Sequence, residues 1–157
     1  MSPKVVGAVL ALVAAGLTLW LWPRAPKDPE AEVRALVASI VKGVEERKLG
    51  PLADALSDRF KGPGGANAQE VKQLVAGQVL RNRETVAVFN PSLSVSVTGA
   101  EDADLDGTFV FARTKAASAE ALEPGAVASA YRITAKLDRT EGEWKFISAT
   151  YEQITWP

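Results

Sequence analysis

The acidic stretch EDADLDG, residues 101–107, has the residue types of a calcium-binding loop. Four of its residues match early ligand and turn positions of an EF-hand loop, namely Asp102, Asp104, Asp106 and Gly107. The closing position must supply a bidentate carboxylate, and here it holds Arg113. We therefore predict no metal site, with an adventitious cation site as the alternative. We interpret the stretch as a solvated acidic turn in which Asp106-Gly107 redirects the chain.

The residue types of most acid–base and nucleophilic catalysis are missing from this chain. It contains no histidine and no cysteine, which removes the commonest general base near neutral pH and the thiolate nucleophile. The sequence also shows no phosphate-binding loop, no nucleophile elbow and no zinc-ligand spacing. We therefore predict no cofactor and expect binding in preference to catalysis, with a pocket enzyme as the alternative.

Two tyrosines on predicted strands, Tyr131 and Tyr151, are the candidate ligand-pocket residues. Ser96 joins them from a serine-rich strand face. The alternatives are a core aromatic with its hydroxyl at the rim for Tyr131 and an exposed sheet face for Ser96. Glu152 follows Tyr151 directly, so these two side chains point to opposite faces of a strand, and we predict no catalytic residue.

The part of the chain from Asp28 onward is mildly acidic. Three of the 18 basic residues precede Asp28, whereas none of the 19 acidic residues does. Because no basic stripe is visible either, nucleic acid is not a predicted partner. The predicted partners are another protein, a second copy of the chain or a small-molecule ligand.

Three helical segments precede the strands in the predicted order. Asp28 is the predicted N-cap of a helix over residues 30–48, with Pro29 at its first position. A shorter helix follows from Gly50-Pro51 to Phe60. After a glycine-rich break, Asn67 and Glu70 resemble a capping box and open a third helix, whose apolar face is Val71, Leu74, Val75 and Val79.

After Arg83 the apolar period changes from that of a helix to that of a strand. The alternating runs that predict strands are residues 93–98, 109–112, 131–137 and 144–154, with a further short strand over 85–89. Helices followed by antiparallel strands predict an α+β domain with the helices on one face of a curved sheet.

Residues 5–22, from Val5 to Trp22, are an uncharged apolar run that predicts a transmembrane helix. Trp20 and Trp22 suit the headgroup level at one end of the span. The alternative is a cleaved signal segment, which the proline three residues before the nearest small-residue cleavage site makes a poor fit. We predict a span over 1–23, a linker over 24–29 and a domain over 30–157 that lies outside the cytoplasm.

The element order and the closing motif GEWKFISATYEQI, from Gly142 to Ile154, resemble the NTF2-like (SnoaL-like) superfamily. A cystatin-like fold with a single helix is the alternative, weakened by the three helical segments. The resemblance implies a cone with a pocket between the sheet and the helices. The chain as a whole is also similar in plan to certain type IV secretion components, in which one membrane span precedes such a domain.

Enzymes of that superfamily, such as ketosteroid isomerases and scytalone dehydratases, use a carboxylate or an Asp–His pair in the pocket. None of these residues carries over, because histidine is absent and Asp138 falls at a predicted turn. With the span predicted above, we therefore predict a membrane-anchored, non-enzymatic binding or assembly module on this fold. The alternative is a small-molecule carrier or an isomerase-like or dehydratase-like pocket enzyme.

Overall fold

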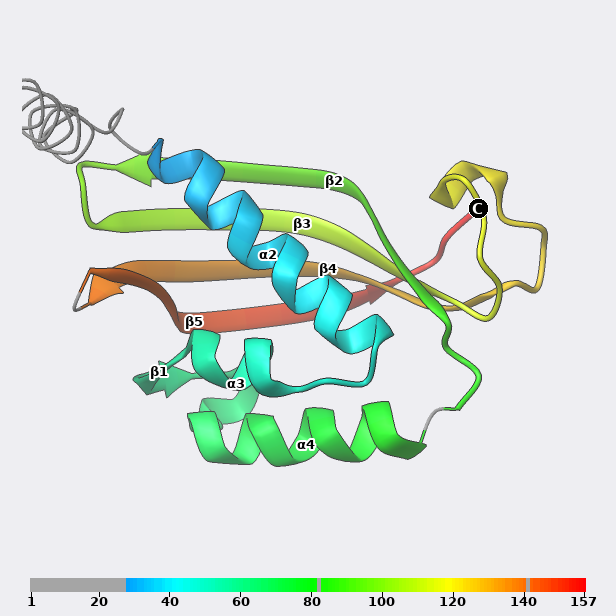
Figure 1. Ribbon diagram of the computed structural model, residues 1–157, viewed down its shortest axis with the longest axis horizontal. Helices are drawn as coiled ribbons and strands as arrows, with labels where there is room; N and C mark the ends of the chain where they lie inside the picture. The colour runs from blue at the N-terminus through cyan, green and yellow to red at the C-terminus, as the bar shows by residue number, and fades with distance from the viewer. Residues whose placement is uncertain (1–27, 82, 141) are drawn as a thin grey trace, which may run out of the picture.

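The computed structural model describes residues 28–81, 83–140 and 142–157, which form three helices on a five-stranded mixed sheet (Figure 1). The predicted α+β class is confirmed, with one strand inserted among the helices. The span, the linker up to Lys27 and their residues Val5, Trp20 and Trp22 lie outside the described residues. None of the described helices has the length and apolar character that a membrane crossing requires.

Helix α2, Pro29–Glu45, runs diagonally across one face of the sheet (Figure 1). Asp28 caps it as predicted, because its carboxylate accepts a hydrogen bond from the Glu30 amide at 3.1 Å. Val33 and Val37 are buried in the main core beneath it, at 0% and 5% exposure. These two positions, one turn apart, make the helix stripe that faces the sheet.

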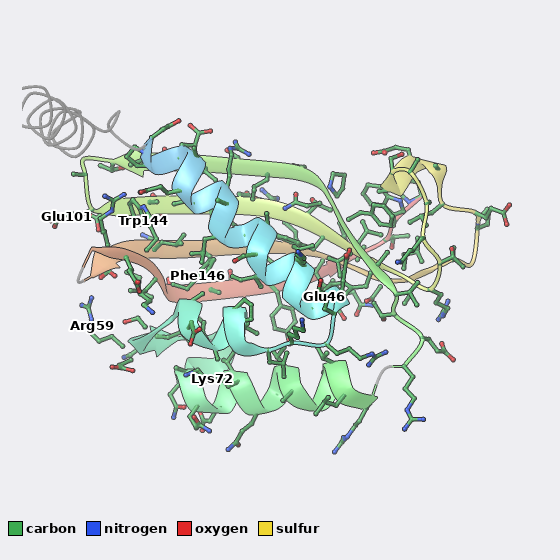
Figure 2. The ribbon with its side chains drawn as sticks, in the orientation of Figure 1. Glu46, Arg59, Lys72, Glu101, Trp144 and Phe146 are labelled. Carbon is green, nitrogen blue, oxygen red and sulfur yellow. The ribbon has the colours of Figure 1, made fainter. Side chains whose placement is uncertain are left out.

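The carboxylate of Glu32 ties the first turns of α2 to the sheet. It accepts hydrogen bonds from the Arg139 guanidinium and, at 3.0 Å, from the Trp144 indole nitrogen. Arg139 in turn lies over the Trp144 ring, 4.9 Å from its centroid. Figure 2 shows Trp144 near the start of α2 and Glu46 at the far end of the helix. We call these three residues the Glu32 clamp.

The prediction of a second helix that extends to Phe60 is wrong beyond Ala55. Helix α3 covers only Gly50–Ala55, and strand β1, Leu56–Lys61, continues from it and pairs in parallel with β5. Leu56, Ser57 and Phe60 are buried in β1 whereas the two residues between them are exposed. That spacing imitates a helical face, and the shifted register against β5 is what breaks the alternation expected of a strand.

Helix α4, Ala68–Arg81, begins with the predicted capping box. The Glu70 amide donates to the Asn67 Oδ1 at 2.9 Å, and the Asn67 amide donates to the Glu70 carboxylate at 2.8 Å. No residue of α4 is buried, so its predicted apolar face does not close tightly on the sheet.

The sheet has the order β1-β5-β4-β3-β2, and its last four strands are antiparallel neighbours. These are β2, Ala87–Thr98; β3, Asp102–Ala112; β4, Val127–Thr140; and β5, Glu143–Ile154. The face under α2 carries the main core, whose larger members include Val95, Leu105, Phe109, Leu137 and Trp144.

The opposite, outer face of the sheet is polar along most of its length and apolar at one end. At that end Val110 and Ala130 pack beneath Ala119 of the β3–β4 connection and against the C-terminal Trp156. Figure 1 shows this connection and the C-terminus together beyond the same end of the strands.

The acidic stretch is strand, and the predicted turn at Asp106-Gly107 is wrong. The chain reverses earlier, at Gly99, whose φ is +65°, and β3 runs straight through residues 102–112. Ala103 and Leu105 are 3% exposed each and point into the core. The alternating aspartates therefore belong to the outer face of an amphipathic strand. The alternation of a strand was missed because the polar positions are all acidic and so resemble a metal-binding loop. Asp138, also predicted in a turn, lies inside β4.

Replacing Glu32 should destabilise the fold far more than replacing its neighbour Glu30. Glu32→Gln leaves the Arg139 charge without its carboxylate at a site where both side chains are about one quarter exposed, and we expect a loss of about 1–3 kcal/mol. Glu30→Gln removes an exposed pair with Arg34 on the same helix and should cost less than about 0.5 kcal/mol. Urea unfolding of both variants measures this, and equal losses would contradict it.

Candidate functional site

A hollow of about 410 Å³ lies between the sheet and the helices, at the end of α2 farthest from Asp28. Its helical side is formed by residues of α2, of the turn that follows α2 and of α4, namely Val44, Arg47, Leu74, Val75, Gln78 and Val79. Its sheet side is formed by Phe111, Ser129, Tyr131, Ile133 and Tyr151, and Thr85 joins them from the segment before β2. This volume is within the range of small-molecule sites, about 300–1,000 Å³.

Three aromatic rings form one continuous wall of the hollow. Phe111 and Tyr131 meet edge to face with centroids 5.9 Å apart, and Tyr131 meets Tyr151 in the same way at 5.8 Å. They come from β3, β4 and β5, whose registers set the rings side by side. The structure thus brings the two predicted pocket tyrosines together in one hollow.

The hollow stays open because the side chains facing it are not packed together. Leu74 on α4 is 59% exposed and Tyr151 on the sheet is 58% exposed. Toward the other end of the sheet, Leu137 and Trp144 fill the space beneath α2 at 1% and 7% exposure. The core is therefore filled where α2 begins and unfilled beside α4.

Arg47 is the one charged residue that lines the hollow among those the structure describes, and no carboxylate lines it. Its Nη1 donates to the Val79 carbonyl of α4 at 2.5 Å. The remaining polar groups of the lining are the neutral side chains of Gln78, Thr85, Ser129 and the two tyrosines. The described lining thus contains neither a histidine nor a carboxylate, the commonest general bases of enzymes.

Ser96 does not reach the hollow. It is exposed and pairs with Asp104 across β2 and β3, on the outer face of the sheet. Sequence reasoning grouped it with the tyrosines because a strand pattern shows alternation without showing which of the two faces the helices cover. Arg47 was missed for the opposite reason: it follows a helix, and nothing local in the sequence marks it as facing the sheet.

Two of the three aspartates of the acidic stretch face cationic partners on β4. Asp106 accepts hydrogen bonds from the Arg132 Nε at 3.0 Å and from its Nη2 at 2.6 Å. Asp104 lies 4.0 Å from the Lys136 Nζ. Within the described ranges no three acidic residues are grouped so as to hold a metal ion. The hydrogen bonds from Arg132 lower the pKa of the Asp106 carboxyl.

A second hollow, of about 620 Å³, lies within the β3–β4 connection and is lined by the connection itself. Its walls are largely small residues such as Ala117 and Ala121, with Pro124 and Gly125. Arg113 holds this connection by donating to the Gly125 carbonyl at 2.9 Å. Although it is larger, it has no aromatic wall, so the hollow beside α4 is the better candidate site.

Comparison with known proteins identifies the fold. No family model matches the sequence, and no curated protein is significantly similar to it. An NTF2-like protein of Pseudomonas putida has a TM-score of 0.60 at 14% identity, over 78% of this chain and 84% of its own. An NTF2-like protein with a cystatin-like fold from Novosphingobium aromaticivorans has a TM-score of 0.61 at 15% identity, over 99% and 92% of the two chains.

A hexachlorocyclohexane dehydrochlorinase of Novosphingobium barchaimii is also similar, with a TM-score of 0.59 at 17% identity over 81% of this chain and 87% of its own. At identities this low the likeness establishes the fold alone. The described domain has the NTF2-like α+β fold, as the sequence resemblance implied.

The pKa shift of Asp106 predicts a pH-dependent contribution to stability. Because the folded pKa is lowered, the stabilisation is present above the unfolded pKa of about 4 and is lost as the pH falls through the folded value. Asp106→Asn should therefore lower the melting temperature at pH 7 and have a shrinking effect in acid. Asp104→Asn, with its longer contact, should have a smaller effect. A difference between wild type and Asp106→Asn that is constant with pH would contradict this.

Proposed function

We propose that this chain is a non-catalytic binding module in which the hollow beside α4 takes an apolar ligand or an apolar group of a partner. The observation that carries the proposal is the lining itself, an aromatic wall with no carboxylate among the described residues. Burial of Leu74 and Tyr151, each more than half exposed, would supply the driving force for binding at about 25 cal/mol per Å² of apolar surface.

The alternative, an elimination or isomerisation enzyme, has the similarity to a dehydrochlorinase in its favour. Removing HCl from a substrate requires a base that takes a proton from carbon. The chain has no histidine, and the ionisable groups in the described lining are Arg47, Tyr131 and Tyr151. Histidine and carboxylate, the commonest general bases of enzymes, are therefore both missing from the described lining. The lining favours binding over this chemistry.

We further propose that residues 5–22 hold the module at a membrane, with the domain outside the cytoplasm. The support is the uncharged run bracketed by Lys4 and Arg24. The described chain begins at Asp28, and α2 leads from there toward the hollow over its 17 residues, about 25 Å. In this arrangement the hollow opens at the end of the domain remote from the point of attachment, where a partner or ligand reaches it from the aqueous phase.

The binding proposal can be tested with the two tyrosines as reporters, since the chain contains only two and both line the hollow. With 3-fluorotyrosine incorporated, both fluorine NMR signals should shift on titration with 2-naphthamide, a neutral flat probe. Leu74→Asn should weaken binding by about fivefold or more. Leu80→Asn is the matched control, because Leu80 is 61% exposed on the same helix and lies outside the lining. Unshifted signals in the wild type, or equal losses in both variants, would overturn the proposal.

The membrane proposal makes a separate prediction. The full chain should remain in the membrane fraction after an alkaline wash, with its amino terminus still preceding residue 5. Amino-terminal sequencing of that fraction measures this. Recovery of a soluble chain that starts near Pro26 would show that the segment is removed and would leave the binding proposal standing.

A further inference from the structure

The last turn of α2 ends in a Schellman motif with arginine where glycine is the rule. The Lys48 amide donates to the Gly43 carbonyl at 2.7 Å, and the Arg47 amide donates to the Val44 carbonyl at 3.1 Å. Arg47 has a φ of +59° and is the one non-glycine residue with positive φ among those the structure describes. A residue with a Cβ is disfavoured in this conformation. Strain of this kind is commonly retained at functional positions.

Arg47 belongs to the helical side of the hollow, whose sheet side carries the aromatic wall. Its guanidinium contacts the Val79 carbonyl of α4, and the residue is exposed. Of the two glutamates that precede it, Glu46 lies 3.3 Å from the Lys48 Nζ, and Glu45 accepts a hydrogen bond from the Val88 amide at 2.8 Å. The hollow therefore has a cation at an exposed position, which we call its mouth, and an aromatic wall on the sheet side.

We propose that the ligand of this hollow is an organic anion, a carboxylate carried on a flat apolar body. The inference rests on the binding function proposed above and specifies its ligand. The apolar body lies against Phe111, Tyr131 and Tyr151, and the carboxylate accepts hydrogen bonds from Arg47. A guanidinium presents five N–H donors, so it can hold a carboxylate while also donating to protein groups such as the Val79 carbonyl.

The position of the charge at the mouth favours an anion for two physical reasons. A carboxylate bound beside exposed Arg47 keeps part of its hydration, so it avoids the cost of burying an ion. A cationic ligand would face Arg47 as a like charge, with no carboxylate in the described lining to offset the repulsion. Arg47 thus selects ligands by their charge, and the aromatic wall selects them by their shape.

The test compares 2-naphthoate with 2-naphthamide, which have the same ring system and differ in charge. Titrations of the full chain labelled with 3-fluorotyrosine should give a dissociation constant about tenfold lower for naphthoate. Arg47→Gly removes the guanidinium and relieves the positive φ, so folding should not suffer. We expect this variant to bind both probes equally, with naphthamide affinity close to that of the wild type.

Two further variants separate charge from structure. Arg47→Lys keeps the charge and should keep part of the preference for naphthoate. Arg34→Gln is the matched control, since Arg34 also donates to a backbone carbonyl, that of Leu93 at 3.0 Å, and does not line the hollow. It should keep the full preference.

The proposal is overturned if wild type binds the two probes equally, if it prefers naphthamide, or if Arg47→Gly keeps the preference. If Arg47→Gly binds neither probe, Arg47→Lys decides the matter: a retained preference supports the proposal and a lost one refutes it. Failure of both probes to bind the wild type would instead refute the binding function itself.

Discussion

The Glu32 carboxylate fixes where α2 lies, and the position of α2 determines which part of the sheet is covered. One oxygen serves both the Arg139 guanidinium and the Trp144 indole, so a single side chain of α2 is tied to β4 and β5 at once. Removing that acceptor would leave two donors without their partner in a partly buried setting, which costs more than the net value of the bonds themselves. The clamp acts at the beginning of the helix, beside the filled part of the core.

Different interactions determine the structure at the C-terminal end of α2. There the Schellman motif ends the helix, and α4 stands beside the sheet with no buried residue. Filling the gap would need larger or differently directed side chains on α4, whereas Leu74 remains 59% exposed. A filled core at one end and an unfilled one at the other is the arrangement that leaves a hollow without loosening the sheet, whose four long strands pair along nearly their whole length.

Local signals predicted the parts of this fold that local interactions decide. The Asp28 cap, the capping box of α4 and the closing hairpin depend on residues within a few positions of one another, and they were predicted correctly. The strand at Phe60 and the strand through Asp106 were not, because a partner strand distant in sequence decides each of them. β1 pairs with β5, and the aspartates of β3 face Arg132 and Lys136 on β4.

The same distinction between local and long-range information applies to the residues of the candidate site. Tyr131 and Tyr151 were predictable because aromatic residues on an amphipathic strand favour the covered face. The placement of Ser96 required knowledge of which face the helices cover, and that of Arg47 required a backbone conformation that its residue type does not suggest. A positive φ is invisible in a sequence unless glycine or asparagine marks it, so the position of this arginine leaves no local signal.

Similar backbones can hold either a binding pocket or a catalytic one, and the side chains decide between them. The backbone of this domain follows that of a dehydrochlorinase with a TM-score of 0.59, yet the lining of its hollow offers a cation, neutral polar groups and aromatic rings. Histidine and carboxylate, the commonest groups for proton abstraction, are absent from the described lining. The residues of the lining do supply what recognition of an apolar anion requires, a flat wall and a positive charge at the mouth.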